Sequence, residues 1–268
     1  MIRSLYSGIG GMKNFQTKLD VIGNNIANVN TYGYKKGRAT FNDLVSQQLA
    51  GASTPVAGGR GGTNPQQVGL GGGLSSVDTI TTQGSLQSTG RDLDLAISGD
   101  GYFVVNDGSG NDFFTRAGNF YLDEGGTMVN ADGYYLSGLD GQPIIIPNDA
   151  GYESYTISPS GEVLGIPSDG EPPVELGQIQ IATFSNPGGL SKAGNNLFAV
   201  TPNSGEPNGG APGIEGRGGI VSSTLEMSNV DLSEEFAEMI VSQRGFQANT
   251  RMITTSDEIL QELVNLKR

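Results

Sequence analysis

Aspartates in the middle of the chain are the side chains best suited to bind a ligand or to do chemistry. They occur at Asp92, Asp94, Asp100, Asp107, Asp112, Asp123 and Asp132. Calcium loops place their acidic ligands as Asp-x-Asp-x-Asp-Gly with a closing glutamate, and the sequence lacks that pattern. Asp and Asn beside glycine are instead typical of tight turns. We therefore expect turns at these positions, with a calcium site as the alternative.

An enzyme built from this sequence would have to rely on carboxylates. There is no cysteine, histidine or tryptophan, which removes thiol and imidazole nucleophiles, the usual zinc ligands and the commonest general base. Glycoside hydrolysis needs two specific carboxylates in a cleft, and nothing singles out such a pair. We expect no catalytic, cofactor-binding or metal-binding residues. A secreted carbohydrate-active enzyme or adhesin on a β scaffold is the remote alternative.

The composition predicts a turn-rich β region and excludes some partners. The 268 residues include 43 glycines, a load that a helical protein would not tolerate. A net charge of −13 makes nucleic acid a poor partner. No apolar run is long enough to cross a membrane, and the first residues are too polar for a secretory signal peptide. We expect no membrane insertion, and any export would use another route.

The C-terminal stretch 231–268 predicts a long helix. Its apolar row repeats every seven residues, which is typical of a helix packed against other helices. The row is Leu232, Met239, Phe246, Ile253 and Leu260. A second, mixed row is offset by four and includes Phe236 and Val264. Asp231 and Glu234 form a plausible capping pair at the start. Such a helix would run to roughly 55 Å, longer than a compact domain needs.

The N-terminal stretch offers a partner for that helix. Apolar residues recur at three- and four-residue steps, and four of them are spaced by sevens. The apolar positions are Leu5, Ile9, Met12, Leu19 and Ile26. We expect this helix to end near Asn28. Its early glycines make it marginal alone but allow a close approach to a partner. The alternative is an ordinary amphipathic helix on the central domain.

The charges of the two ends also differ. Basic residues dominate 1–38, whereas acidic residues are in excess in 231–268. This favours pairing of the ends with each other or with neighbouring copies, and two solvated faces are the alternative.

These patterns together predict an α+β fold. The terminal helices would pair as a coiled coil, and the middle would form a mostly antiparallel β-rich domain. The expected divisions are an N-terminal helix at 1–30, an extended glycine-rich connector at 31–90, a β-rich domain at 91–222, and a strand or connector with the C-terminal helix at 223–268. Within the connector, the low-complexity stretch 46–76 is expected to be an extended or flexible linker rather than a phosphate-binding loop.

Several motifs, taken in order, resemble the bacterial flagellar rod and hook proteins. Residues 4–12 and 19–35 are similar to the N-terminal signature of that family, and residues 243–249 and 257–266 to its C-terminal signature. Residues 90–97, 101–103 and 115–120 are similar to its β domain. The positions that match the signatures are Asn24, Asn25, Ala27, Asn28, Thr31, Gly33, Gln243, Arg244, Gln247 and Asn249.

The resemblance implies a subunit of a tubular homopolymer. The paired helices would line a central channel, with the apolar rows of both helices serving polymerisation. The chain would be exported by the flagellar type III apparatus without a cleaved signal peptide and would act in the extracellular flagellum. Its other partners would be adjacent rod and hook–filament junction proteins, and the hook cap during assembly.

Two positions along the flagellar axis remain open. Residues 88–97 and 4–31 resemble short hook proteins of Gram-positive bacilli, so the expectation is a hook subunit that acts as a flexible, torque-transmitting joint. The alternative is the distal rod protein of the basal body, which the length of the chain and the stretch 46–76 resemble.

Overall fold

The computed structural model describes residues 2–55, 61–147, 152–167 and 172–266. The chain divides into two compact units. Unit 1 consists of Met1–Ile26, Gly37–Asp78 and Asp231–Arg268, and unit 2 consists of Ala27–Lys36 and Thr79–Val230. Residues 31–90, expected to be one connector, therefore contribute to both units.

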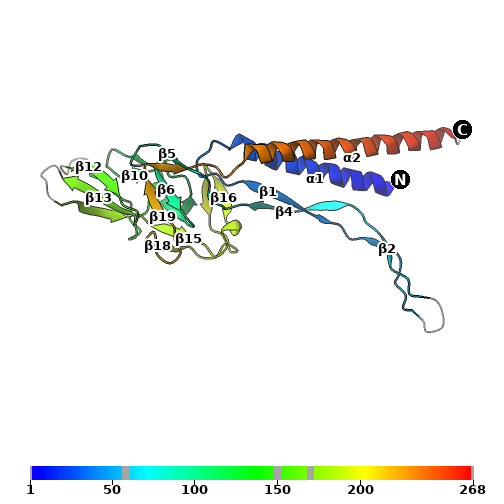
Figure 1. The fold of residues 1–268 in the computed structure, drawn as a ribbon, viewed down its shortest axis with the longest axis horizontal. Helices are drawn as coiled ribbons and strands as arrows, with labels where there is room; N and C mark the ends of the chain where they lie inside the picture. The colour runs from blue at the N-terminus through cyan, green and yellow to red at the C-terminus, as the bar shows by residue number, and fades with distance from the viewer. Residues whose placement is uncertain (1, 56–60, 148–151, 168–171, 267–268) are drawn as a thin grey trace. The chain divides into compact units, whose positions relative to one another are not determined.

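Two long helices form the main part of unit 1. They are α1, Ile2–Ala27, and α2, Leu232–Leu266 (Figure 1). The Asp231 carboxylate accepts hydrogen bonds from the backbone N–H groups of Ser233, at 2.8 Å, and Glu234, at 3.4 Å, and so caps α2 as predicted. Both helices occur where the seven-residue spacing predicts them. The last two residues of the predicted C-terminal helix, 267–268, lie outside the described residues.

The rest of unit 1 is a ribbon of paired strands. Strand β1, Gly37–Asp43, pairs with β4, Gly72–Thr79, and β2, Gln47–Ala50, pairs antiparallel with β3, Gln66–Val68 (Figure 1). Where the sequence predicts an extended or flexible linker at 46–76, the structure has extended backbone that is paired into strands at 47–50 and 66–68. Backbone pairing is reinforced by cross-strand hydroxyl contacts, such as Thr40 to Ser76 at 2.7 Å. Residues 56–60 of the expected linker are not among the described residues.

Unit 2 contains the remaining strands, which are short. They are β5 (Leu86–Ser88), β6 (Leu95–Ser98), β7 (Tyr102–Asn106), β8 (Asp112–Thr115), β9 (Tyr121–Leu122), β10 (Met128–Val129), β11 (Tyr135–Leu136), β12 (Tyr152–Ile157), β13 (Glu162–Pro167), β14 (Val174–Gln178), β15 (Ile181–Thr183), β16 (Ser191–Gly194), β17 (Leu197–Ala199), β18 (Asn208–Gly210), β19 (Gly219–Ser222) and β20 (Thr224–Glu226). A single-turn 3-10 helix occupies Pro187–Gly189.

The largest sheet of unit 2 has the order β16-β17-β8-β7-β11-β10-β9, and β15 pairs with both β7 and β18. Smaller groups are β12-β13-β14, β6 with β19, and β5 with β20. The pairings of these strands are antiparallel, as the sequence predicts.

The main hydrophobic core lies in unit 2. Leu95 and Ile97 of β6 and Phe103 of β7 are completely buried in one large cluster. The rings of Phe103 and Phe120 meet edge to face with their centroids 5.4 Å apart. Unit 2 can therefore hold its shape through its own apolar contacts.

Candidate functional site

The two helices of unit 1 form an antiparallel pair with a close approach. Gly11 of α1 lies against Asn249, at the middle of α2: a Cβ on Gly11 would be 2.9 Å from Asn249 Nδ2. One turn further along α1 and one turn back along α2, a Cβ on Gly245 would collide with the ring of Phe15. Small residues at these points allow the helices to pack closely, as the glycines of the N-terminal helix suggest.

Polar contacts hold the other end of this pair. Asn25 is 2% exposed and Glu235 is 5% exposed. The amide of Asn25 donates to Glu235 Oε2 at 3.2 Å and to the carbonyl oxygen of Gly37 at 2.9 Å. Gly37 N–H donates back to Asn25 Oδ1 at 2.9 Å. One buried side chain thus joins α1, α2 and the first strand of the ribbon.

The predicted apolar row of α2 lies only partly inside the pair. Met239, Phe246, Ile253 and Leu260 are half-buried, whereas Leu232 is exposed. The second row expected from the sequence is also outside, because Phe236 and Val264 are exposed.

A different second row of α2 faces inward, offset by three residues from Leu232 instead of four. It contains the buried Glu235, Ser242 and Ser256 and the half-buried Asn249. Small and polar side chains fit this row because the helices approach too closely for large ones.

The predicted positions of α1 have a similar distribution. Leu5, Met12, Leu19 and Ile26 are half-buried, and Ile9 is exposed. Among the described side chains of this helix, the large apolar one that is buried is Ile22, which the rows did not select.

The family-signature positions fall into structural and exposed groups. Gly33 has a φ of +68°, and a Cβ there would lie 2.5 Å from the backbone nitrogen of Ala117, so only glycine fits. Asn28 Oδ1 accepts a hydrogen bond from the hydroxyl of Thr31 at 3.2 Å. The exposed positions are Asn24, Ala27, Gln243, Arg244 and Gln247. The remaining positions, Asn25 and Asn249, make the contacts described above.

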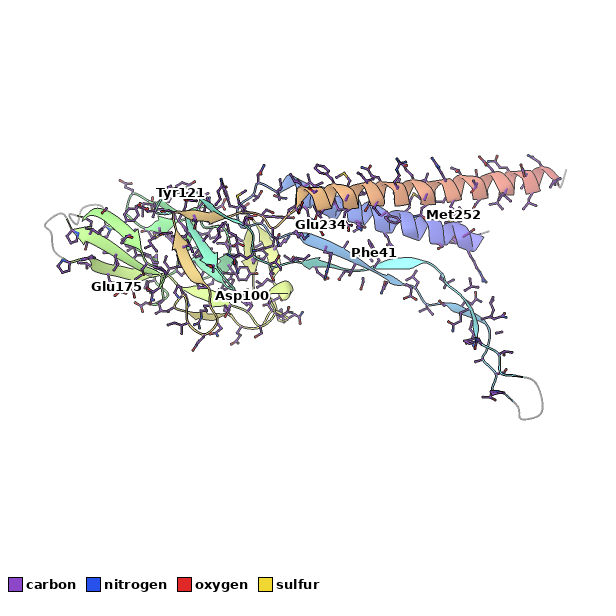
Figure 2. The ribbon with its side chains drawn as sticks, in the orientation of Figure 1. Phe41, Asp100, Tyr121, Glu175, Glu234 and Met252 are labelled. Carbon is purple, nitrogen blue, oxygen red and sulfur yellow. The ribbon has the colours of Figure 1, made fainter. Side chains whose placement is uncertain are left out.

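Unit 1 leaves a large amount of apolar side-chain surface uncovered. Phe236 is 49% exposed and Val241 is 63% exposed on α2, and Val45 of the ribbon is 84% exposed. Phe41 of β1 and Met252 of α2 are further examples, and Figure 2 labels both. Exposed apolar side chains in such number are typical of a surface that another protein covers. The arrangement suits assembly rather than binding of a small molecule.

Unit 2 contains a buried cluster of charged side chains that the sequence did not predict. Glu226 Oε1 accepts hydrogen bonds from Lys35 Nζ at 2.6 Å and from Gly84 N–H at 2.8 Å. Glu226 Oε2 lies 3.2 Å from Arg116 Nη1. Lys35, Arg116 and Glu226 are each almost completely buried. Lys35 and Arg116 both lie in motifs that resemble those of the flagellar family. This resemblance was the only feature of the sequence that pointed to either residue.

Burial shifts the pKa of one group in this cluster and of one group beside it. Burial lowers the pKa of Lys35 below its ordinary value, and the adjacent Glu226 opposes that shift. Burial also raises the pKa of the Tyr102 phenol.

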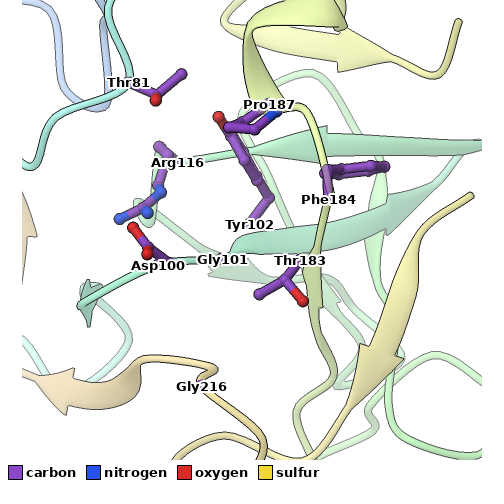
Figure 3. A pocket seen from close by; sticks show the side chains of 9 residues that line it. All are labelled: Thr81, Asp100, Gly101, Tyr102, Arg116, Thr183, Phe184, Pro187 and Gly216. Atoms are coloured by element: carbon purple, nitrogen blue, oxygen red, sulfur yellow. The ribbon is translucent and has the colours of Figure 1, made fainter. Parts of the chain in front are cut away.

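A pocket of about 340 Å³ lies on unit 2 beside these residues (Figure 3). Asp100, Tyr102, Arg116, Phe184 and Pro187 contribute to its lining. The guanidinium group of Arg116 already forms an ion pair with Glu226. The lining residues provide no nucleophile paired with a base.

The aspartates considered for calcium make hydrogen bonds within turns and loops. Asp107 Oδ1 accepts Ser109 N–H at 2.7 Å, and Asp107 Oδ2 accepts the Asn111 amide at 2.9 Å. The bond from Asn111 holds the pKa of Asp107 below its ordinary value. Asp132 Oδ1 instead accepts the amide of Asn195, which is 63 positions away in the sequence, at 3.1 Å. Across the described ranges, no group of three or more acidic side chains is placed to hold a metal ion. None of the helices in those ranges is long and apolar enough to cross a membrane.

Three family models match parts of the chain. Residues 5–35 match the model of the flagella basal body rod protein, and residues 96–165 match the D1 domain of the flagellar hook protein FlgE/F/G. Residues 221–266 match the C-terminal model of the flagellar basal body rod FlgEFG protein. The first and last matches cover most of α1 and α2, and the second lies in unit 2.

Relatives of known name are similar over the full length. The flagellar basal-body rod protein FlgG of Bacillus subtilis strain 168 is 57% identical over 270 residues, covering 100% of both chains. FlgG of Borreliella burgdorferi is 40% identical over 268 residues, again covering 100% of both. The flagellar hook protein FlgE of Borreliella burgdorferi is 33% identical, in an alignment of 444 residues that covers 100% of both.

Proposed function

Because this chain belongs to the family of flagellar rod and hook proteins, we propose that it is a structural subunit of the distal rod of the flagellar basal body. In this role many copies form a tube that transmits torque, and the chain has no catalytic activity. The observation that carries the proposal is the 57% identity to a rod protein over the whole of both chains.

The comparison with hook proteins supports the rod in preference to the hook expected from residues 4–31 and 88–97. Alignments to two hook proteins extend over 444 and 466 residues at 33% and 29% identity. Those to rod proteins of Bacillus and Borreliella extend over 270 and 268. This chain has 268 residues, so it has the length of the rod relatives and lacks room for the additional segments of those hook proteins.

The surface of unit 1 supports a role in assembly. Apolar side chains such as Phe236 and Val241 remain exposed in a single chain, although α1 and α2 already pack on each other. A second copy of the chain would cover this surface. We propose that the paired helices and the ribbon make the contacts between copies, and that neighbouring rod and hook components contact the ends of the polymer.

Export of the subunit from the cell is also part of the proposed function. A rod subunit must leave the cytoplasm, and this chain would do so without a cleaved signal peptide, through the flagellar export apparatus. Its place would be the flagellum, where no membrane insertion is needed.

Deletion of the gene distinguishes a rod subunit from a hook subunit. We expect cells without this protein to build basal bodies with shortened rods and no hook, because hook assembly needs a finished rod. Expression of the wild-type chain should restore both structures. Complete rods that merely lack a hook would contradict the rod and would support the hook as the second candidate.

A further inference from the structure

The stretches of unit 2 that lead to unit 1 are bound to one another. The chain passes between the two units after Ile26, Lys36, Asp78 and Val230. Three stretches of unit 2 lie next to three of these crossings: residues 33–36 end at the second, residues 80–85 follow the third and residues 226–229 precede the fourth. Met227 N–H donates to the carbonyl oxygen of Ser85 at 2.8 Å, which directly joins the second and third stretches.

Glu226 contacts all three stretches. Its carboxylate binds Lys35 Nζ and Gly84 N–H, and its backbone carbonyl oxygen accepts Gly33 N–H at 2.8 Å. Its other carboxylate oxygen holds Arg116, whose guanidinium group also donates to the carbonyl oxygen of Gly99 at 2.9 Å. The carboxylate thereby connects the crossings to the body of the unit.

Asn229 also links the three stretches, at a position closer to the crossings. Its side-chain oxygen accepts Lys36 N–H at 2.8 Å, and its amide donates to the carbonyl oxygen of Ile80 at 2.9 Å. Ile80 N–H in turn donates to the carbonyl oxygen of Lys36 at 2.9 Å. Lys35 adds a bond from its ammonium group to the carbonyl oxygen of Thr82 at 2.8 Å.

We propose that Lys35, Glu226 and Asn229 form a clamp that makes the three stretches bear force together when load passes between the units. We call these residues the exit clamp. Strand β20 is only three residues long, so it would peel from β5 one bond at a time if it were pulled alone. The exit clamp requires that a buried ion pair and several hydrogen bonds break together, which raises the barrier to forced unfolding.

Single-molecule pulling tests the exit clamp directly. The chain has no cysteine, so two introduced cysteines give unique attachment points. Handles at Ser233→Cys and Asp140→Cys, both exposed positions, send force into unit 2 through the crossing after Val230. At a given force, we expect Glu226→Gln to unfold roughly tenfold faster or more, because it leaves two buried cations without a counter-ion. Asn229→Ala should unfold several-fold faster.

Matched controls separate a clamp from ordinary stabilisation. Glu206→Gln changes an exposed carboxylate and Asn203→Ala changes an exposed amide, so neither should alter the unfolding rate. A second pair of handles, at Ser109→Cys and Glu175→Cys, loads unit 2 without its crossings. The clamp predicts a larger effect of Asn229→Ala with the first pair of handles than with the second.

Two results would overturn the proposal. One is an equal unfolding rate for wild type and Asn229→Ala under load through the crossing. The other is an equal acceleration with both pairs of handles, which general destabilisation would produce. Asn229→Ala keeps the buried ion pairs, so the comparison stands even where Glu226→Gln fails to fold.

The use of the exit clamp in torque transmission rests on the proposed rod function, but the clamp itself does not. Pulling is done on single chains, whereas the rod assignment is tested by the basal bodies of deletion cells. The two proposals can therefore fail separately: the rod assignment can be wrong while the exit clamp is confirmed, and the exit clamp can be wrong while the rod assignment is confirmed.

Discussion

Gly245 shows how one residue governs the packing of the two helices. A Cβ at this position would collide with the ring of Phe15. We expect Gly245→Ala to lower the free energy of unfolding of the helix pair by about 1–3 kcal/mol, although alanine favours helix more than glycine does. Urea unfolding followed by helical circular dichroism measures this change.

Two further variants identify the cause. Gly23 lies in α1, and a Cβ added there would have nothing within 4 Å, so Gly23→Ala should stabilise by up to about 1 kcal/mol. Shortening the opposing side chain with Phe15→Leu should recover part of the loss in Gly245→Ala. Equal effects of alanine at positions 23 and 245 would show that close packing is not the reason.

Tyr102 predicts a dependence of stability on alkaline pH. Burial raises the pKa of its phenol above the ordinary value of 10.0, so the folded chain keeps the proton longer than the unfolded chain does. The stabilising contribution is complete below the unfolded pKa and is lost as pH rises through the folded value. We expect wild type to lose more stability between pH 8 and pH 11 than Tyr102→Phe, measured by urea unfolding. Parallel losses would contradict the assigned burial effect.

The sequence revealed some of the important residues and concealed others. Gly33 and Asn25 were selected because they match family signatures, and the structure gives each a buried role. The charged cluster was missed because Lys35 and Glu226 are separated by 191 positions in sequence. Neither residue is distinctive alone, and their pairing depends on strand β20 reaching β5.

Among the elements, the helices were predictable because an apolar seven-residue repeat is typical of helices that pack on one another. The inward-facing second row was not, since Ser242 and Ser256 carry no apolar signal and are selected only by the close approach of α1. The paired strands at 47–50 and 66–68 were hidden by their glycine-rich and polar surroundings. Their pairing uses the backbone, which leaves little trace in the side-chain pattern.

The ribbon of unit 1 gives a prediction about elements. A two-stranded ribbon is marginally stable in water by itself, and β2 and β3 have only exposed residues. We expect their amide hydrogens to exchange rapidly in the single chain and to become at least tenfold slower in the polymer, where neighbouring copies cover them. Mass-spectrometric hydrogen exchange on both states measures this. Equal rates would show that the ribbon takes no part in assembly.

For the whole molecule, exposed side chains should matter to assembly without mattering to folding. Val241 is 63% exposed, so Val241→Asp should change the free energy of unfolding by no more than about 0.5 kcal/mol. The same change should prevent polymerisation, because a charge would be buried between copies. Sedimentation and electron microscopy measure the assembly.

Val241→Leu is the matched control, since it keeps an apolar side chain at the same position. Normal polymers from Val241→Asp would contradict a contact through this face of α2.

The choice between rod and hook illustrates what short motifs cannot decide. Residues 4–31 lie almost entirely within the part of the chain that matches the model of the basal body rod protein, so their resemblance to hook proteins discriminates poorly between members of the family. Chain length and sequence identity over the whole chain discriminate better, because they reveal whether a relative contains segments that this chain does not have. The family was therefore accessible from local motifs, and the position along the axis was not.

A map of the purified hook–basal body by electron cryo-microscopy would show whether the rod assignment is right. We expect side-chain density in the distal rod to fit this sequence, with the exposed apolar side chains of α2 covered by neighbouring copies. Density for this sequence in the hook, with another chain in the distal rod, would contradict it.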